Sequence, residues 1–145
     1  MIRSIKKFLR INLFKLFKLS INVSKIISTT THTDLLVFTS YGKVYRLRAH
    51  QIPEMSKQAK GIPFLNLIKI EKNELVVSLL ATNEYNEDEY LVTITKLGII
   101  KRTPISQYQR INVNGKIALS MRENDELVKV MKVKENDEII IGASN

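Results

Sequence analysis

The sequence contains no cysteine and no tryptophan, and only three of its 145 residues are proline. Without cysteine, a disulfide framework and a thiolate metal site are both excluded. No apolar run reaches the roughly 18 residues that a membrane-spanning helix requires. The five glycines are scattered along the chain and form no phosphate-binding loop. These absences leave an ordinary globular domain, for which a reducing cytoplasm is the default compartment.

Positive charge is concentrated near the N-terminus. The formal net charge is +9, yet the first 33 residues hold seven Lys or Arg and no acidic residue. The remaining 112 residues hold sixteen basic and fourteen acidic side chains, so they are close to neutral. The high net charge therefore describes the first segment more than the domain. Alone, it is weak evidence for a nucleic-acid partner.

Residues 1–20 differ in kind from the rest of the chain and are treated as a separate leader. Apolar residues recur in it at helical spacing, at Ile2, Ile5, Leu9, Leu13 and Leu16. With lysine and arginine on other faces, this pattern predicts a basic amphipathic helix. Three interpretations stay open: a helix that binds a membrane surface, an arm that binds nucleic acid, and an accidental leader of a truncated gene copy. The last is favoured.

From about residue 23 onward, short apolar runs broken by turn residues replace the helical pattern. These runs predict strands at residues 35–39, 44–48, 75–80, 90–95, 99–103, 127–133 and 138–141. Gly42 lies between the first two runs, where a tight hairpin turn needs a positive φ. The predicted fold class is all-β.

An internal repeat organises these strands. Residues 35–46 (LLVFTSYGKVYR) match residues 91–102 (LVTITKLGIIKR) at an offset of 56, which pairs Gly42 with Gly98 and Arg46 with Arg102. Further matches pair residues 60–61 with 114–115 at an offset of 54, and residues 73–76 with 125–128 at an offset of 52. The repeats span about 35–88 and 89–136, and a third begins at 137. A period of about 50 residues with four strands is typical of propeller blades.

Five stretches carry a resemblance to a known family: FTSYGKVYRL at 38–47, EMSKQAKGIP at 54–63, TKLGIIKRT at 95–103, RINVNGKIAL at 110–119 and RENDEL at 122–127. They resemble repeated elements of the C-terminal domain found in the A subunit of DNA gyrase, and the match runs from about residue 21 to residue 145. The equivalent domain of topoisomerase IV is a related alternative. The resemblance implies an incomplete β-pinwheel, a propeller-like fold of four-stranded antiparallel blades. It also implies a basic rim that binds and bends duplex DNA.

The chain departs from the family at its DNA-wrapping motif, a Gln-Arg-Arg-Gly-Gly-Lys-Gly run. Only degenerate equivalents occur, at residues 58–61 (QAKG) and 112–116 (NVNGK). The five tyrosines all lie in blade-like contexts, so none is a candidate for the DNA-cleaving nucleophile. We therefore expect no enzyme activity, no cofactor and no metal in this chain. In the family, cleavage and ATP binding belong to other domains and subunits.

A DNA-bending surface needs positive charge on a rigid, curved support. The candidate DNA-binding residues are Lys43, Arg46, Arg48, Lys57, Lys60, Lys101, Arg102, Arg110 and Lys116. Arg46 and Arg102 carry extra weight because they share a repeat position. The simpler interpretation is that each is an ordinary solvated charge. Structural turn residues are expected at Gly42, Gly61, Gly98 and Gly115.

Two classes of function follow from these patterns. The favoured one is a non-catalytic, sequence-independent DNA-binding fragment, associated with the nucleoid in the cytoplasm and with other gyrase subunits. The alternatives are an interaction protein held at a membrane by its leader and a gene remnant without function. Two blades leave sheet edges open, so self-association is also expected.

Overall fold

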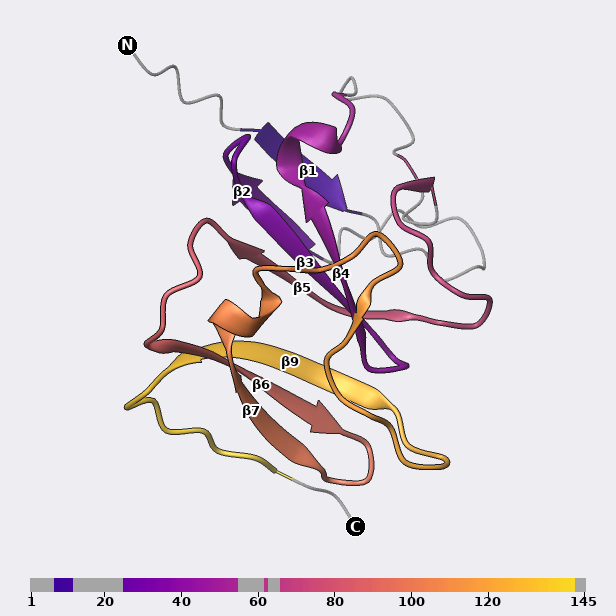
Figure 1. The fold of residues 1–145 in the computed structure, drawn as a ribbon, viewed down its shortest axis with the longest axis vertical. Helices are drawn as coiled ribbons and strands as arrows, with labels where there is room; N and C mark the ends of the chain where they lie inside the picture. The colour runs from indigo at the N-terminus through magenta and orange to yellow at the C-terminus, as the bar shows by residue number, and fades with distance from the viewer. Residues whose placement is uncertain (1–6, 12–24, 55–61, 63–65, 143–145) are drawn as a thin grey trace.

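The computed structural model describes residues 7–11, 25–54, 62 and 66–142, and within these it is an antiparallel β protein (Figure 1). Its strands form three sheets, with the orders β1-β2, β5-β3-β4-β8 and β7-β6-β9. Their bounds are β1 (Lys7–Ile11), β2 (Lys25–Thr29), β3 (Asp34–Thr39), β4 (Lys43–Arg48), β5 (Val76–Thr82), β6 (Glu89–Thr95), β7 (Ile100–Pro104), β8 (Lys116–Ile117) and β9 (Leu127–Lys134). Two short 3-10 helices, η1 (Ala49–Gln51) and η3 (Ile105–Tyr108), follow β4 and β7. The all-β prediction is confirmed.

Six of the seven predicted strands are present, as β3 to β7 and β9. The seventh, at residues 138–141, is wrong, because no described residue of this segment lies in a strand. A strand needs a hydrogen-bonding partner, and none of the described segments pairs with it. Ile140 is accordingly 98% exposed.

The two repeats fold alike, which confirms the offset of 56. Gly42 and Gly98 both have positive φ, +72° and +82°, as the turn between paired strands requires. Each repeat carries the same irregularity, a register shift after Phe38 in β3 and after Ile94 in β6. A 3-10 helix follows the second strand of each repeat. The shared turns and bulges therefore come from the sequence pattern, not from the packing of one repeat alone.

The predicted offset of 52 near the end of each repeat is wrong by one residue. Ser40 N donates to Leu75 O over 2.8 Å, and the equivalent bond joins Lys96 N to Glu126 O over 2.9 Å. The structural offset is therefore 51, which places Glu74 opposite Asp125 rather than Glu126. The identical letters Glu-Leu-Val suggested the other alignment. The turn decides it, because a left-handed asparagine precedes each carboxylate, at Asn73 (φ 74°) and Asn124 (φ 60°).

The second repeat contributes a strand to the sheet of the first. The first sheet obtains its fourth strand, β8, from the second repeat, while the second sheet has three strands. Two backbone amides extend the contact, since Ala118 N and Leu119 N both donate to Gly42 O, over 2.8 and 3.2 Å. A blade of this protein is thus completed by its neighbour.

One core lies between the two larger sheets, and a second covers the outer face of the first sheet. The first core is built around the fully buried Leu36, Phe38 and Leu91, and Phe38 meets the ring of Tyr108 edge-on at 5.9 Å. The second core includes Leu35 and Val37 of β3 together with Ile27 of β2. Side chains alternate between these cores along β3, as expected for a strand buried on both faces.

The predicted helix in the leader is wrong for Lys7–Ile11, which is strand β1. This strand pairs antiparallel with β2, Lys7 opposite Thr29 and Ile11 opposite Lys25. The β-branched run of β2 offers a hydrogen-bonding partner, and this pairing overrides the local helical period. The rest of residues 1–20 lies outside the described residues. The boundary at residue 20 therefore stays a prediction.

Candidate nucleic-acid interface

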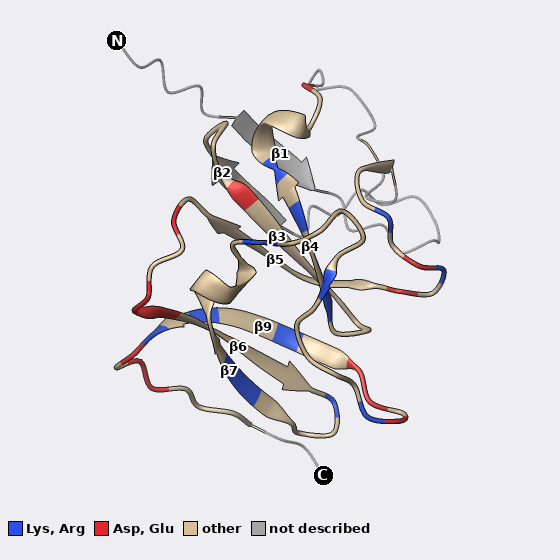
Figure 2. Cartoon of the chain, in the orientation of Figure 1, with Lys and Arg blue, Asp and Glu red and all other residues tan. Residues whose placement is uncertain are grey.

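The structure describes seven of the nine candidate DNA-binding residues. Lys57 and Lys60 lie outside the described residues, as does the predicted turn glycine Gly61. Basic residues lie within β4, β7 and β9, whereas acidic residues lie mainly in the connections (Figure 2). The strands therefore present positive charge on a fixed frame, which a surface for phosphates requires.

Four of the described candidates gather around the loop at residues 105–119. Arg46 donates to the carbonyl of Gln109 over 2.6 Å, and Lys116 donates to the carbonyl of Gln107 over 2.7 Å. Lys101 donates to the carbonyl of Ala118 over 3.1 Å, and Arg110 is exposed on the loop itself. Lys101 and Lys116 are thus anchored at carbonyls, which do not neutralise their positive charge.

A close approach at Gly115 adds to these anchors of the loop. Gly115 has φ +83°, and a Cβ at this position would lie 2.8 Å from Cε1 of Tyr45. Glycine removes that clash, so the loop packs directly on a buried tyrosine of β4. The ammonium group of Lys116, the next residue, lies 5.9 Å from the ring centroid of Tyr108, a distance at which a cation–π interaction is felt.

A cleft of about 400 Å³ opens beside this loop, along β4 where β8 no longer covers it. Its basic side chains are Arg46, Arg48 and Lys69, and the side chain of Arg48 is 55% exposed. The other lining residues are Tyr45, Leu47, Gln51, Asn66, Leu67, Ile68, Ile111, Asn112 and Val113. Sequence analysis missed Lys69, because the offset of 54 places an acid, Glu123, opposite it and the repeat gives no signal.

One carboxylate lies beside the arginines of this cleft. Asp34 Oδ2 is 3.9 Å from Arg46 Nη1, and Asp34 Oδ1 is 3.9 Å from Arg48 Nε. Tyr85 also donates to Asp34 Oδ2, over 2.8 Å. Burial and this hydrogen bond raise the pKa of Tyr85 far above its ordinary value. A single negative charge faces two guanidinium groups, so the cleft keeps a net positive charge.

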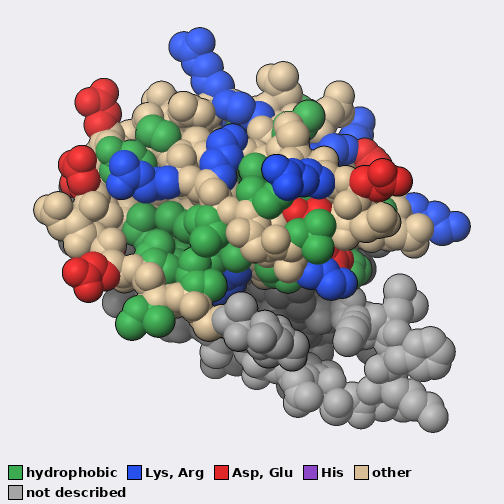
Figure 3. Space-filling view, turned by 90° about the horizontal axis from the view of Figure 1, so that it is seen from below, with side chains coloured by type: hydrophobic (Ala, Val, Ile, Leu, Met, Phe, Trp, Pro, Cys, Tyr) green, Lys and Arg blue, Asp and Glu red, His purple; other side chains and the backbone are tan. Residues whose placement is uncertain are grey.

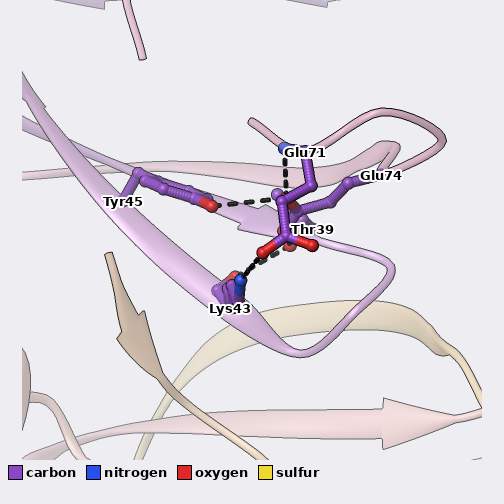
Figure 4. A network of polar contacts seen from close by, with 5 residues as sticks. All are labelled: Thr39, Lys43, Tyr45, Glu71 and Glu74. Carbon is purple, nitrogen blue, oxygen red and sulfur yellow. Dashed lines mark hydrogen bonds and ion pairs between the residues drawn. The ribbon is translucent and has the colours of Figure 1, made fainter. Parts of the chain in front are cut away.

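Lys43 belongs to a polar network rather than to the cleft (Figure 4). It pairs with Glu71, and that hydrogen bond raises the pKa of Lys43. The buried Glu74 accepts hydrogen bonds from Thr39 and, over 3.3 Å, from the hydroxyl of Tyr45. The network ties β3 and β4 to the turn before β5. Lys43 is therefore partly neutralised before any phosphate approaches.

Arg102 lies apart from the loop cluster. Its neighbour Lys101 reaches Ala118 in the inter-sheet core, and successive residues of a strand point to opposite faces. Arg102 therefore points to the far face of the second sheet, where its guanidinium lies 4.4 Å from the ring centroid of Tyr90. The structure thus does not bring Arg46 and Arg102 together, although they share a repeat position.

A family model described as the DNA gyrase C-terminal domain, a β-propeller, matches residues 33–83 and 89–134. These ranges correspond to the two repeats. The chain belongs to the DNA gyrase C-terminal domain family. The A subunit of DNA gyrase from Mycoplasma genitalium is 51% identical over 124 residues, which cover 86% of this chain and 15% of the relative. The corresponding protein from Staphylococcus aureus (strain MRSA252) is 43% identical over 124 residues, covering 85% and 14%.

Two solved structures share the fold. The C-terminal domain of DNA topoisomerase IV superposes with a TM-score of 0.70 at 21% identity, over 74% of this chain and 34% of that one. A DNA gyrase A C-terminal domain superposes with a TM-score of 0.59 at 18% identity, over 91% and 39%. The family resemblance expected from the repeats is confirmed. The chain spans about 15% of the length of the Mycoplasma relative. Among the described residues, no helix is long and apolar enough to cross a membrane.

Proposed function

We propose that this chain binds duplex DNA without reading its sequence and bends it, as a DNA-wrapping module of the gyrase A type. The observation that carries the proposal is the loop at 105–119 with its adjoining cleft. Arg46, Arg48, Lys69, Arg110 and Lys116 gather there on a frame of paired strands. Phosphate contacts from such residues fix the path of DNA but carry no sequence information.

The chemistry of the cluster suits phosphate oxygens. A guanidinium group offers several fixed donors, and Arg48 is exposed enough to use them. The amide side chains of Asn66 and Asn112 add neutral donors to the same cleft. Each neutralised phosphate releases counterions, so binding by this surface weakens steeply with salt. Curvature of the bound DNA follows from contacts on more than one blade.

The proposal includes no catalytic role for the described residues. The phenol of Tyr85 donates to Asp34, and Tyr45 and Tyr108 are buried, with pKa values raised by burial. A phenol in that state is a poor nucleophile. The partners of this function are double-stranded DNA and other gyrase subunits, in the cytoplasm where the nucleoid lies.

The bending part of the proposal is tested with duplexes that carry a donor and an acceptor dye at their ends. Binding of the full chain should shorten the distance between the ends, and the energy transfer should be the same for duplexes of unrelated sequence. A matched comparison uses Arg48→Ala with Lys69→Ala, which should reduce the bound fraction. Binding without any change in energy transfer would remove the bending part, and dependence on one sequence would contradict the sequence-independent part.

A further inference from the structure

A carboxylate lies where it can compete with a DNA phosphate for two arginines of the cleft. Asp34 Oδ2 is 3.9 Å from Arg46 Nη1, and its other oxygen, Oδ1, is 3.9 Å from Arg48 Nε. A carboxylate and a phosphate offer a guanidinium group the same kind of acceptor, an anionic oxygen. Asp34 and an incoming phosphate therefore seek the same donors.

The pairing of β3 with β4 places this carboxylate. Asp34 lies directly opposite Arg48 in the register of the two strands, and Arg46 is its diagonal neighbour, two residues earlier on β4. Opposed and diagonal residues of paired strands share one face of the sheet. The position at the start of β3 therefore faces both arginines at once.

The second repeat has an aromatic ring at the equivalent position. At the offset of 56, Tyr90 corresponds to Asp34. The guanidinium of Arg102, the counterpart of Arg46, lies 4.4 Å from the centroid of the Tyr90 ring. Both repeats thus bring the same two positions together, one with an acid and the other with an uncharged ring. The blade fold itself therefore does not require an acid at this position.

The carboxylate of Asp34 is held by more than the arginines. Tyr85 donates a hydrogen bond of 2.8 Å to Asp34 Oδ2. The backbone of Asp34 is paired on both sides, with Arg48 of β4 and with Thr82 of β5. Its side chain is only 14% exposed. The negative charge therefore stays in place when an arginine changes its partner.

The two arginines differ in how easily they can leave Asp34. Arg46 is 25% exposed and also donates to the carbonyl of Gln109 over 2.6 Å, so its guanidinium is fixed. Arg48 is 55% exposed, and its separation of 3.9 Å from Asp34 is longer than a direct hydrogen bond. An exposed ion pair of this kind adds little to stability. Arg48 is therefore the side chain that can turn from the carboxylate to a phosphate.

We propose that Asp34 holds Arg48 in the free chain and competes with DNA phosphate for it. This inference rests on the proposed function, because it assigns a role within the same site. On binding, Arg48 exchanges the carboxylate for a phosphate oxygen, while Arg46 keeps its bond to Gln109. The fixed charge of Asp34 then lies near the bound phosphate and repels it. Asp34 thus lowers the affinity for DNA and favours release of the duplex.

Fluorescence anisotropy with a labelled duplex and the full chain tests this role. Asp34→Asn removes the charge and keeps an oxygen that accepts from Tyr85. It should bind DNA about threefold to fivefold more tightly than the wild type at low salt, which is the strength of a surface ion pair. Asp34→Ser, a second uncharged variant, should give a similar gain. Circular dichroism and cooperative melting show which variants are folded.

Glu89→Gln is the matched control. It also removes one negative charge, and the side chain of Glu89 is likewise 14% exposed, but it pairs with Lys132 of β9 and does not line the cleft. Seen from the side of the second sheet, basic and acidic side chains are interspersed around hydrophobic ones, so that side presents a surface of mixed charge (Figure 3). Glu89→Gln should therefore raise the affinity for DNA by much less than Asp34→Asn.

A double-mutant cycle with Arg48→Ala separates competition from a change in folding. Without the guanidinium of Arg48, the gain from Asp34→Asn should fall to that of the Glu89→Gln control. Tyr85→Phe disturbs the same contact but leaves the carboxylate charged, so it should not tighten binding.

Two results would overturn the inference while the proposed function stands. In both, the wild type binds DNA: either the folded uncharged variants gain no more than the control, or their gain is undiminished in the Arg48→Ala background. If neither the folded wild type nor folded Asp34→Asn binds duplex DNA at low salt, the proposed function fails and the inference fails with it.

Discussion

Arg46 of the first repeat donates a hydrogen bond of 2.6 Å to the backbone carbonyl of Gln109 in the second. The side chain is only 25% exposed, and Asp34 lies 3.9 Å from the same guanidinium. The residue therefore has two roles. It fastens the loop at 105–119 to β4, and it places positive charge at the mouth of the cleft.

Replacing Arg46 with alanine should cost more stability than replacing Arg102. A hydrogen bond from a charged donor contributes about 1.5–3 kcal/mol, whereas a partly exposed cation–π contact contributes about 0.5–1 kcal/mol. Urea denaturation of Arg46→Ala and Arg102→Ala measures both. Arg46→Lys should recover part of the loss, because an ammonium still donates. Equal losses for the two alanine variants would show that the bond to Gln109 does not stabilise the domain.

Gly42 and Gly98 form a matched pair of substitution sites that tests the packing of β8 and the residues after it against the first repeat. A left-handed φ costs an alanine about 1–2 kcal/mol at either site. Only Gly42 adds a clash, because the new Cβ would meet Leu119 O and lie 2.6 Å from Met121 Cε. Gly42→Ala should therefore lower the free energy of unfolding well beyond Gly98→Ala. Equal effects in a denaturant titration would argue against this packing in solution.

Tyr85 makes the free energy of unfolding depend on pH in the alkaline range. Burial, and then the hydrogen bond to Asp34, raise its pKa in the folded chain, while an unfolded tyrosine titrates near about pH 10. The folded state thus holds its proton more tightly. The stabilisation is complete below about pH 10 and is lost as the pH rises above that value. Tyr85→Phe should flatten the fall of unfolding free energy with alkaline pH, measured by urea titrations at several pH values.

Two other tyrosines also contribute to the alkaline pH dependence, in the wild type and in Tyr85→Phe alike. Tyr45 and Tyr108 also have pKa values raised by burial, so the slope of Tyr85→Phe should decrease without vanishing. The variant should also lose about 1 kcal/mol at neutral pH, where the hydrogen bond to Asp34 is intact in the wild type. An unchanged alkaline slope would show that Tyr85 does not carry this dependence.

The sequence predicts those parts of the fold that local chemistry determines. Gly42 and Gly98 mark turns that need a positive φ, and the runs on either side alternate or are wholly apolar. The two-residue strand β8 carries no such pattern, because Lys116 and Ile117 become a strand only when β4 lies beside them. Lys7–Ile11 shows the opposite case, in which a helical period gives way to pairing with β2.

In the candidate site, too, the sequence predicts local features but not the contacts that only the folded chain makes. Repeat symmetry selected Arg46 and Arg102, but symmetry describes positions in a blade and not neighbours in space, so the two lie on different surfaces. The partner of Lys43 is Glu71, 28 residues away, which no local pattern indicates. The repeat places the acid Glu123 opposite Lys69, so repeat symmetry gives no signal for it, and only the folded chain brings Lys69 into the same cleft as Arg48.

The most direct test of the account is the salt dependence of duplex DNA binding, followed by fluorescence anisotropy on the full chain. Arg48→Ala with Lys69→Ala should weaken binding and reduce the slope of log affinity against log salt by about two, one for each lost phosphate contact. Lys96→Ala is the control, since Lys96 follows β6 directly, is exposed, pairs with Glu126 just before β9 and does not line the cleft. It should leave the slope unchanged. An unchanged slope in the double variant, or no binding by the folded chain at low salt, would contradict the account.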